Sequence, residues 1–226
     1  MMPDHGVTAL LLSFGLGYFL GCIPFARLVA EWRKVDLRRL GSGNIGAANA
    51  FVVAGKVPGI VILLGDACKG AAAVLLVRAI IPNYGPAVAA AAVGAVIGHD
   101  WPLYLHFKGG RGTATTIGVM LAVDWRVLVL GAAAYLVFFL ATRYTVISSL
   151  VAVAVMPIAM VVAPYADTAV HRDPLPYAYG AAIIAGIGFL RHWDHVERFL
   201  QGREPKAVDM FREMKARGVE ALHLDD

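Results

Sequence analysis

The stretch AVAAAAVGAVIG, residues 87–98, contains only small and aliphatic side chains, so a helix formed by it has no polar face to turn toward water. The stretch VLVLGAAAYLVFFLAT, residues 127–142, is almost as apolar. Of the 226 residues, 59% are hydrophobic and only 16% are charged, whereas about a quarter of a typical soluble domain is charged. Long apolar runs are typical of membrane-spanning helices. The composition therefore predicts an all-α integral membrane protein, a compact bundle of about seven transmembrane helices.

Seven apolar segments are candidate membrane spans. The fourth has only about fourteen residues, and a helix of that length reaches ~21 Å, less than the ~30 Å of the hydrocarbon core. We expect it to begin in a polar pocket or to be buried among other helices, so five or six full spans are the alternative. The expected spans are residues 7–30, 54–81, 86–104, 110–123, 127–142, 146–163 and 177–190.

Lysine and arginine are unevenly distributed between the loops. Fourteen lie in the loops after the first, third and fifth spans and in the C-terminal segment, whereas the alternating loops hold only Arg126 and Arg172. Because cytoplasmic loops are enriched in these residues, we expect the N-terminus outside and the C-terminus in the cytoplasm. Residues 1–202 are the expected transmembrane domain, and residues 203–226 are a polar cytoplasmic tail. The chain from about Arg191 onward is amphipathic, and we expect it to form a helix on the cytoplasmic membrane surface.

Polar residues interrupt the apolar pattern at the ends of spans that are expected to face the cytoplasm. Loops at one membrane face can meet, so we expect four polar clusters to form one pocket. The clusters are GSGNIGAAN at 41–49, GDACKG at 65–70, GHDWPLYLHFKGGRGTATT at 98–116 and RHWDH at 191–195.

The first cluster has its glycines in the spacing G-x-G-x-x-G, at Gly41, Gly43 and Gly46. A dinucleotide-binding turn has this spacing but needs a preceding strand and a βαβ unit, which membrane helices do not provide. A Walker loop is excluded because no G-K-[ST] follows. Glycines still allow backbone N–H groups to surround a phosphate, and Ser42 and Asn44 add side-chain donors. We expect a phosphate-binding loop, with a flexible hinge as the alternative.

The third cluster contains a second glycine-rich segment, FKGGRG, in which Lys108 and Arg111 lie on either side of a glycine pair. A threonine-rich helix is expected to start directly after it. Cations, free backbone amides and hydroxyl groups at a helix N-terminus form an anion-binding site. The alternative is that Lys108 and Arg111 each only mark the cytoplasmic side of the membrane, as positive charges in such loops do.

Further titratable residues in the clusters have two interpretations. Asp66 and Lys69 lie three residues apart and can form an ion pair on one helix face, or Lys69 can point toward a phosphate. His192 and His195 have a spacing seen in metal sites, but no further ligand is evident. We therefore expect neither a metal nor another cofactor.

Five segments follow one another along the chain: GYFLGCIPFARLVA continuing to GSGNIGAAN, then GDACKG, GHDWPLYLHFKGGRGTAT, TRYTVISSLVA and RHWDHVERFLQG. Their order and spacing resemble those of the bacterial acyl-phosphate:glycerol-3-phosphate acyltransferase family. The resemblance extends from about Gly17 to Gly202. Five ordered matches are much more specific than a single glycine loop.

The resemblance implies an inner-membrane enzyme that transfers a fatty acyl group from acyl phosphate to the 1-hydroxyl of glycerol 3-phosphate, the first step of phospholipid synthesis. The products are lysophosphatidic acid and inorganic phosphate. Two phosphate-bearing substrates agree with two anion-binding loops, and the acyl chain requires a pocket open to lipid. Acyl phosphate is already activated, so positioning and charge stabilisation can supply catalysis. The expected partners are these substrates and membrane lipid; nucleic acid is not expected, and the oligomeric state is left open.

Functional residues are carried over by matching motif positions. The expected catalytic residues are Ser42, Arg111 and His192, and Ser42 is expected to contact phosphate or the developing oxyanion. The positions expected to bind substrate phosphate are Gly41, Gly43, Asn44, Gly46, Asn49, Lys69, Lys108, Gly109, Gly110, Gly112 and His195. Motif positions are also occupied by Asp66, Gly70 and His99.

The chain departs from the family pattern in three motifs. Ala48 replaces a threonine, Arg111 a lysine and His195 an asparagine. The most serious change is Val52, because it replaces an arginine and removes a cation from the expected phosphate site. A lost charge-assisted hydrogen bond costs on the order of 1.5–3 kcal/mol. Arg111, or Lys56 one turn after Val52, is a candidate to replace that cation.

Two other function classes are alternatives. A retuned or inactive relative would bind acyl phosphate or phospholipid precursors without turnover. A transporter would need polar residues across the whole bilayer, whereas here they gather at one face.

Overall fold

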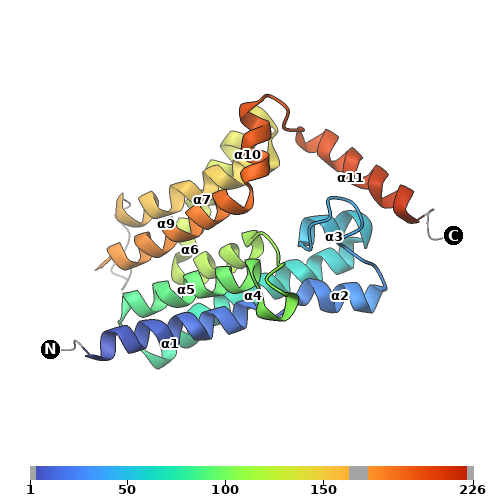
Figure 1. The fold of residues 1–226 in the computed structure, drawn as a ribbon. Coiled ribbons are helices and arrows are strands. Elements are labelled where there is room, and N and C mark those ends of the chain that lie inside the picture. The colour runs from blue at the N-terminus through green and yellow to red at the C-terminus, as the bar shows by residue number, and fades with distance from the viewer. Residues whose placement is uncertain (1–3, 163–172, 223–226) are drawn as a thin grey trace.

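The structure, a computed structural model, describes residues 4–162 and 173–222 (Figure 1). The regular elements within these residues are all helices, which confirms the predicted all-α class. In chain order they are α1 (Asp4–Gly21), α2 (Phe25–Arg33), α3 (Ala47–Val53), α4 (Lys56–Ile80), α5 (Gly85–Asp100), the 3₁₀ helix η1 (Leu103–Leu105), α6 (Thr113–Thr142), α7 (Thr145–Val162), α9 (Leu175–Arg191), α10 (Trp193–Leu200) and α11 (Ala207–Leu222).

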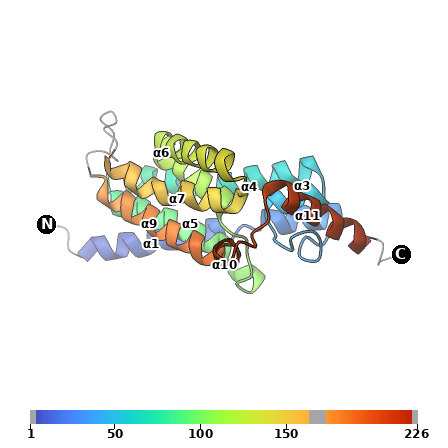
Figure 2. The ribbon, with the colours of Figure 1, turned by 90° about the horizontal axis from the view of Figure 1, so that it is seen from above.

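Five stretches of the described residues are long and apolar enough to cross a membrane, and α9 is a shorter apolar helix. The five stretches are Gly6–Arg33, Lys56–Ile80, Gly85–Leu105, Thr113–Thr142 and Thr145–Val162. Their helices run roughly side by side in both ribbon views (Figures 1 and 2). Large apolar side chains are exposed on them, such as Leu11 and Leu136, and on α9, such as Ile183. This is the surface that a multi-pass protein presents to lipid.

The helix α6 reverses direction in its middle. At Asp124 the backbone leaves the helical conformation, with φ −157° and ψ 110°. Thr113 and Tyr135 lie on either side of this break and line the same cavity, although a straight helix would separate them by ~33 Å. The two arms of α6 therefore match the fourth and fifth predicted spans. Counted this way, the described residues contain seven apolar segments, in agreement with the sequence.

The first predicted helix, over residues 7–30, is wrong in one respect because the chain breaks within it. Helix α1 ends at Gly21 and α2 begins at Phe25. Pro24 lies directly before α2, and a proline restricts the preceding residue to non-helical conformations. The amphipathic α2 buries Ala26 and Val29 in one cluster with Ala50 of α3, so it lies at the end of the bundle that carries α3.

Small residues allow close helix contacts in the centre of the bundle. A Cβ atom added at Gly17 of α1 would collide with the backbone of Ala91 in α5. A Cβ atom at Gly118 of α6 would collide with the backbone of Ala67 in α4. In a membrane the hydrophobic effect does not drive helices together, so they associate through close backbone packing of this kind. The Ala-rich stretch 87–98 therefore lies at the centre of the bundle. Its packing sets the position of the polar C-terminal end of α5.

Candidate active site

The four polar clusters meet at the end of the bundle that also carries α3 and α10 (Figure 1). The second and third clusters are joined by Asp66 and His99, whose Oδ1 and Nδ1 atoms lie 3.4 Å apart. The third and fourth are joined by Arg191, which donates to the carbonyl oxygen of Gly110 at 2.6 Å. Directly before the first cluster, Arg38 donates to the carbonyl oxygen of Lys108 at 2.8 Å. The structure thus brings together the clusters that the sequence placed at one face.

The first glycine-rich loop is held from inside by the amide of Asn49. This side chain is 1% exposed, accepts a hydrogen bond from the N–H of Ser42 and donates to the carbonyl oxygens of Leu37 and Leu40. Gly41 has a positive φ of 60°, and a Cβ atom there would collide with Asn49. The Asn49 amide is therefore occupied in shaping the loop.

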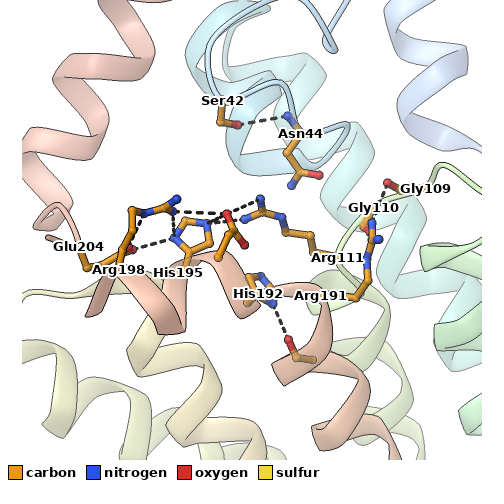
Figure 3. Close-up of polar contacts among 12 residues, drawn as sticks. Ser42, Asn44, Gly109, Gly110, Arg111, Arg191, His192, His195, Arg198 and Glu204 are labelled. Atoms are coloured by element: carbon orange, nitrogen blue, oxygen red, sulfur yellow. Dashed lines mark hydrogen bonds and ion pairs between the residues drawn. The ribbon is translucent and has the colours of Figure 1, made fainter. Parts of the chain in front are cut away.

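Ser42 and Asn44 lie on the outer side of this loop. The hydroxyl of Ser42 accepts a hydrogen bond from the N–H of Asn44 at 3.4 Å. The side chain of Asn44 points toward the side on which Arg111 and His192 lie (Figure 3). The loop therefore presents two polar side chains across from the last cluster.

The second glycine-rich loop folds back onto the end of α5. The N–H groups of Gly109 and Gly110 donate to the carbonyl oxygens of Asp100 and His99 at 3.1 and 3.2 Å. These two amides are not free, contrary to the expectation of open backbone donors at this loop. A Cβ atom at Gly110 would collide with the His99 ring. The two glycines thus allow the loop to pack closely against the end of α5. Lys108 lies directly before the glycine pair and Arg111 directly after it.

Arg111 contacts the last cluster directly. Its Nη1 lies 2.5 Å from Nε2 of His195, and its Nη2 lies 3.6 Å from a carboxylate oxygen of Asp194. Nδ1 of His195 lies 2.7 Å from the carboxylate of Glu204 (Figure 3). Both ring nitrogens of His195 are therefore occupied by protein groups.

His192 lies just beyond α9 and is buried. Its Nδ1 donates to the carbonyl oxygen of Gly188 at 2.9 Å. Burial lowers the pKa of His192 to about 4, and the charge of nearby Arg111 acts in the same direction. The ring is therefore neutral at pH 7, and with the proton on Nδ1 its Nε2 is an acceptor. Within the part of the chain that the structure describes, no group of three His, Cys, Asp or Glu side chains is placed to hold a metal.

A cavity of about 450 Å³ extends from this polar end into the bundle. Its polar wall includes Asp100, Arg111, Thr113 and His192. The apolar part of its wall includes Val96, Ile117, Leu128, Val153, Met156 and Ile184. Such a cavity fits a molecule with an anionic head and an acyl chain.

Lys69 lies in a buried ion pair. Its Nζ is 2.8 Å from Oδ1 of Asp66 and donates to the carbonyl oxygen of Ile23 at 2.9 Å. The side chains of Lys69 and Asp66 are each 3% exposed. This geometry supports the structural alternative for Lys69, an ion pair that orients α4 against the chain between α1 and α2.

Two polar residues of this site, Arg38 and Glu204, lie outside the four predicted clusters. Arg38 holds the second loop and Glu204 holds His195. Arg191 and Asp100 lie within the predicted clusters, and the structure shows that Arg191 also holds the second loop and that Asp100 lines the cavity. A signal for Glu204 exists in GREP at 202–205, because a glycine that ends a helix can turn the next residues back onto it.

A family model described as glycerol-3-phosphate acyltransferase matches residues 11–202 of the chain. The chain belongs to the glycerol-3-phosphate acyltransferase family. Proteins of that name from Thermotoga petrophila and Rubrobacter xylanophilus are 35% identical over 198 residues and 40% identical over 192 residues. These alignments cover 87% and 84% of this chain, and 95% and 92% of the two relatives.

The fold is similar to the crystal structure of PlsY (YgiH), an integral membrane glycerol 3-phosphate acyltransferase, in its glycerol 3-phosphate form. The TM-score is 0.77 at 31% identity, covering 87% of this chain and 94% of that one. The lysophosphatidic acid form gives the same TM-score at 29% identity, covering 89% and 97%. These findings confirm the family resemblance that the sequence motifs indicated. Glu204 and α11 lie beyond the segment that the family model matches.

Proposed function

We propose that this protein transfers a fatty acyl group from acyl phosphate to the 1-hydroxyl of glycerol 3-phosphate. The observation that carries the proposal is the cavity, which joins an apolar chamber to the motif residues Arg111 and His192. An acyl chain fits the apolar part, and a phosphate fits the cationic end. Solved relatives of the family are known in glycerol 3-phosphate and lysophosphatidic acid forms, which are the acceptor and the product of this reaction.

The chemistry needs little beyond positioning. The glycerol oxygen attacks the carbonyl carbon of acyl phosphate, the bond from that carbon to the phosphate oxygen breaks, and the leaving phosphate takes the hydroxyl proton. Nε2 of His192 can accept the hydrogen bond of the hydroxyl group and orient it, because the ring is neutral with its proton on the side of Gly188. A histidine with so low a pKa is a weak base, so the final acceptor of the proton is the phosphate.

Cationic and polar groups at the same end stabilise the charge that moves onto phosphate. Arg111 lines the cavity, Lys108 is exposed on the preceding loop, and Ser42 is exposed on the first loop. Of the remaining predicted phosphate positions, Lys69 lies in the ion pair of α4, and the others, including Asn44 and His195, belong to the two glycine-rich segments and the last cluster. Val52 is half-buried on α3, so Arg111 is the cation that we assign to the role of the missing arginine.

The proposed location is the bacterial inner membrane with the site facing the cytoplasm. The excess of Lys and Arg in the loops of the site end supports this orientation. Single cysteines introduced at Ala48 and Asn83 test it by labelling of intact cells with a membrane-impermeant reagent. Ala48 is expected to be protected and Asn83 labelled, and the opposite pattern would invert the topology.

A retuned relative that binds without turnover is a second candidate, favoured by Val52. The deciding experiment is release of inorganic phosphate by purified protein given palmitoyl phosphate, with and without glycerol 3-phosphate. Release that depends on glycerol 3-phosphate supports the transferase. No release from folded protein, beside an active relative as control, favours the retuned relative, and restoration of turnover by Val52→Arg would identify the missing cation as the cause.

A further inference from the structure

The imidazole of His195 connects two residues from separate segments of the chain. On one side its Nδ1 lies 2.7 Å from Oε1 of Glu204, and on the other its Nε2 lies 2.5 Å from Nη1 of Arg111 (Figure 3). The side chain of Glu204 is 2% exposed and that of His195 is 11% exposed. A buried carboxylate, an imidazole and a guanidinium thus form one continuous chain of contacts that ends at the cavity.

The chemistry of these groups selects one form of the histidine. A guanidinium has only N–H donors, so the ring nitrogen beside Arg111 must offer its lone pair. Nδ1 has two neighbours, the Glu204 carboxylate at 2.7 Å and Nη2 of Arg198 at 2.9 Å. The carboxylate is the closer of the two and can only accept, and Nη2 of Arg198 has another acceptor in Asp194 at 3.4 Å. The proton of the neutral ring therefore lies on Nδ1, where Glu204 accepts it. The other tautomer would place an N–H against Arg111 and a lone pair against the carboxylate. Glu204 therefore fixes the ring in the form that can hold Arg111.

The backbone after α10 places Glu204 where it can do this. Gly202 has a positive φ of 67°, and the N–H of Arg203 returns to the carbonyl oxygen of Arg198 at 2.7 Å. This turn brings Glu204 back onto α10, where it also accepts a hydrogen bond from Nε of Arg198 at 3.0 Å. Two donors therefore fix its carboxylate.

We propose that Glu204, acting through His195, is a positioning residue that holds Arg111 at the polar end of the cavity. The proposal rests on the proposed function, in which Arg111 binds phosphate. An arginine side chain is long and flexible, and a cation that is fixed before the substrate arrives stabilises developing charge better than one that must be ordered first. Because Val52 removes another expected cation, the orientation of Arg111 matters more in this chain.

The test is a double-mutant cycle on kcat/KM for palmitoyl phosphate, with Glu204→Ala, Arg111→Ala and the double variant. Glu204→Ala is expected to lower kcat/KM roughly tenfold to hundredfold, as loss of an outer orienting partner does in metal sites. In the Arg111→Ala background the same change is expected to cost less than about threefold, because the group that it positions is gone. Thermal unfolding of each variant reports the structural effect separately.

The matched control is Glu197→Ala. Glu197 is an exposed glutamate of α10, the helix that carries His195, and its carboxylate accepts from Gln201 at 3.2 Å. Its loss is expected to leave kcat/KM within about twofold of wild type. Losses from Glu204→Ala and Arg111→Ala that multiply in the double variant would overturn the proposal, because Glu204 would then act independently of Arg111.

A variant that fails to fold does not end the test. Glu204→Gln keeps an oxygen that accepts from Nδ1 and loses the charge, so it is expected to give a smaller loss that again disappears in the Arg111→Ala background. If wild type shows no turnover, the proposed function fails, and the same cycle is read on the affinity for palmitoyl phosphate. Non-additive losses of affinity would still support the positioning role, and additive ones would reject it.

Discussion

The side-chain oxygen of Asn49 accepts a hydrogen bond from the backbone N–H of Ser42 at 2.9 Å. The nitrogen of the same amide donates to the carbonyl oxygens of Leu37 and Leu40 at 2.9 and 3.0 Å. One buried side chain of α3 thus holds the start of the loop that presents Ser42.

Asn49→Ala is expected to release this loop. The buried partners lose their hydrogen bonds, so the free energy of unfolding should fall by about 1–3 kcal/mol. A displaced Ser42 should also lower kcat/KM about tenfold or more, because small misplacements near the reacting atoms are costly. Thermal unfolding and phosphate release measure the two effects. Asn83→Gly, at a positive φ of 60° in the loop before α5, is expected to change neither, and wild-type kcat/KM in Asn49→Ala would show that the loop needs no anchor.

Ser42→Ala and Lys108→Ala are expected to impair phosphate release while leaving the unfolding temperature unchanged. Both side chains are exposed, so their removal leaves no cavity and no buried unpaired group. Loss of a charge-assisted contact should cost about tenfold to hundredfold in kcat/KM. Lys34→Ala, also at an exposed position, controls for the general effect of removing a surface charge. Wild-type rates in both variants would mean that the glycine loops are hinges.

Ala152→Phe is expected to change the preferred acyl-chain length. Ala152 lines the cavity on α7, and a phenyl ring there occupies space that a long chain would need. The ratio of kcat/KM for palmitoyl phosphate to that for octanoyl phosphate should fall at least about tenfold, since burial of each CH₂ contributes about 0.8 kcal/mol. Ala154→Phe, two residues further along and not part of the cavity wall, should leave the ratio unchanged. An unchanged ratio in Ala152→Phe would place the acyl chain elsewhere.

Protonation of His192 is expected to make stability depend on pH. In the folded protein burial lowers its pKa to about 4, whereas an exposed histidine has a pKa of about 6.5. Between these values the unfolded chain binds a proton that the folded protein does not, so stability falls as the pH decreases from about 6.5 to about 4. The full effect is roughly 3 kcal/mol. His192→Asn should remove this part of the pH dependence, and identical pH profiles of thermal unfolding for the two proteins would contradict it.

Much of the site was visible in the sequence because its chemistry depends on residue types in short segments. Glycine-rich loops next to Lys108 and Arg111, and histidines after the last span, identify an anion site at one face. Their contacts were not visible. Asn49 holds its own loop, and the amides of Gly109 and Gly110 bond to the end of α5. These pairings depend on distances between helices, which local sequence does not encode.

The sequence by itself determined that this chain lies in a membrane as a bundle of apolar helices, because a helix without a polar side has no stable place in water. It also predicted about seven apolar segments and polar clusters that gather at one end of the bundle. Only the tertiary structure decided that the two arms of α6 enclose a cavity together with α7 and α9, and that Glu204 reaches Arg111 through His195. Those features arise where segments far apart in the chain come within hydrogen-bonding or packing distance, and only packing of the whole bundle sets those distances.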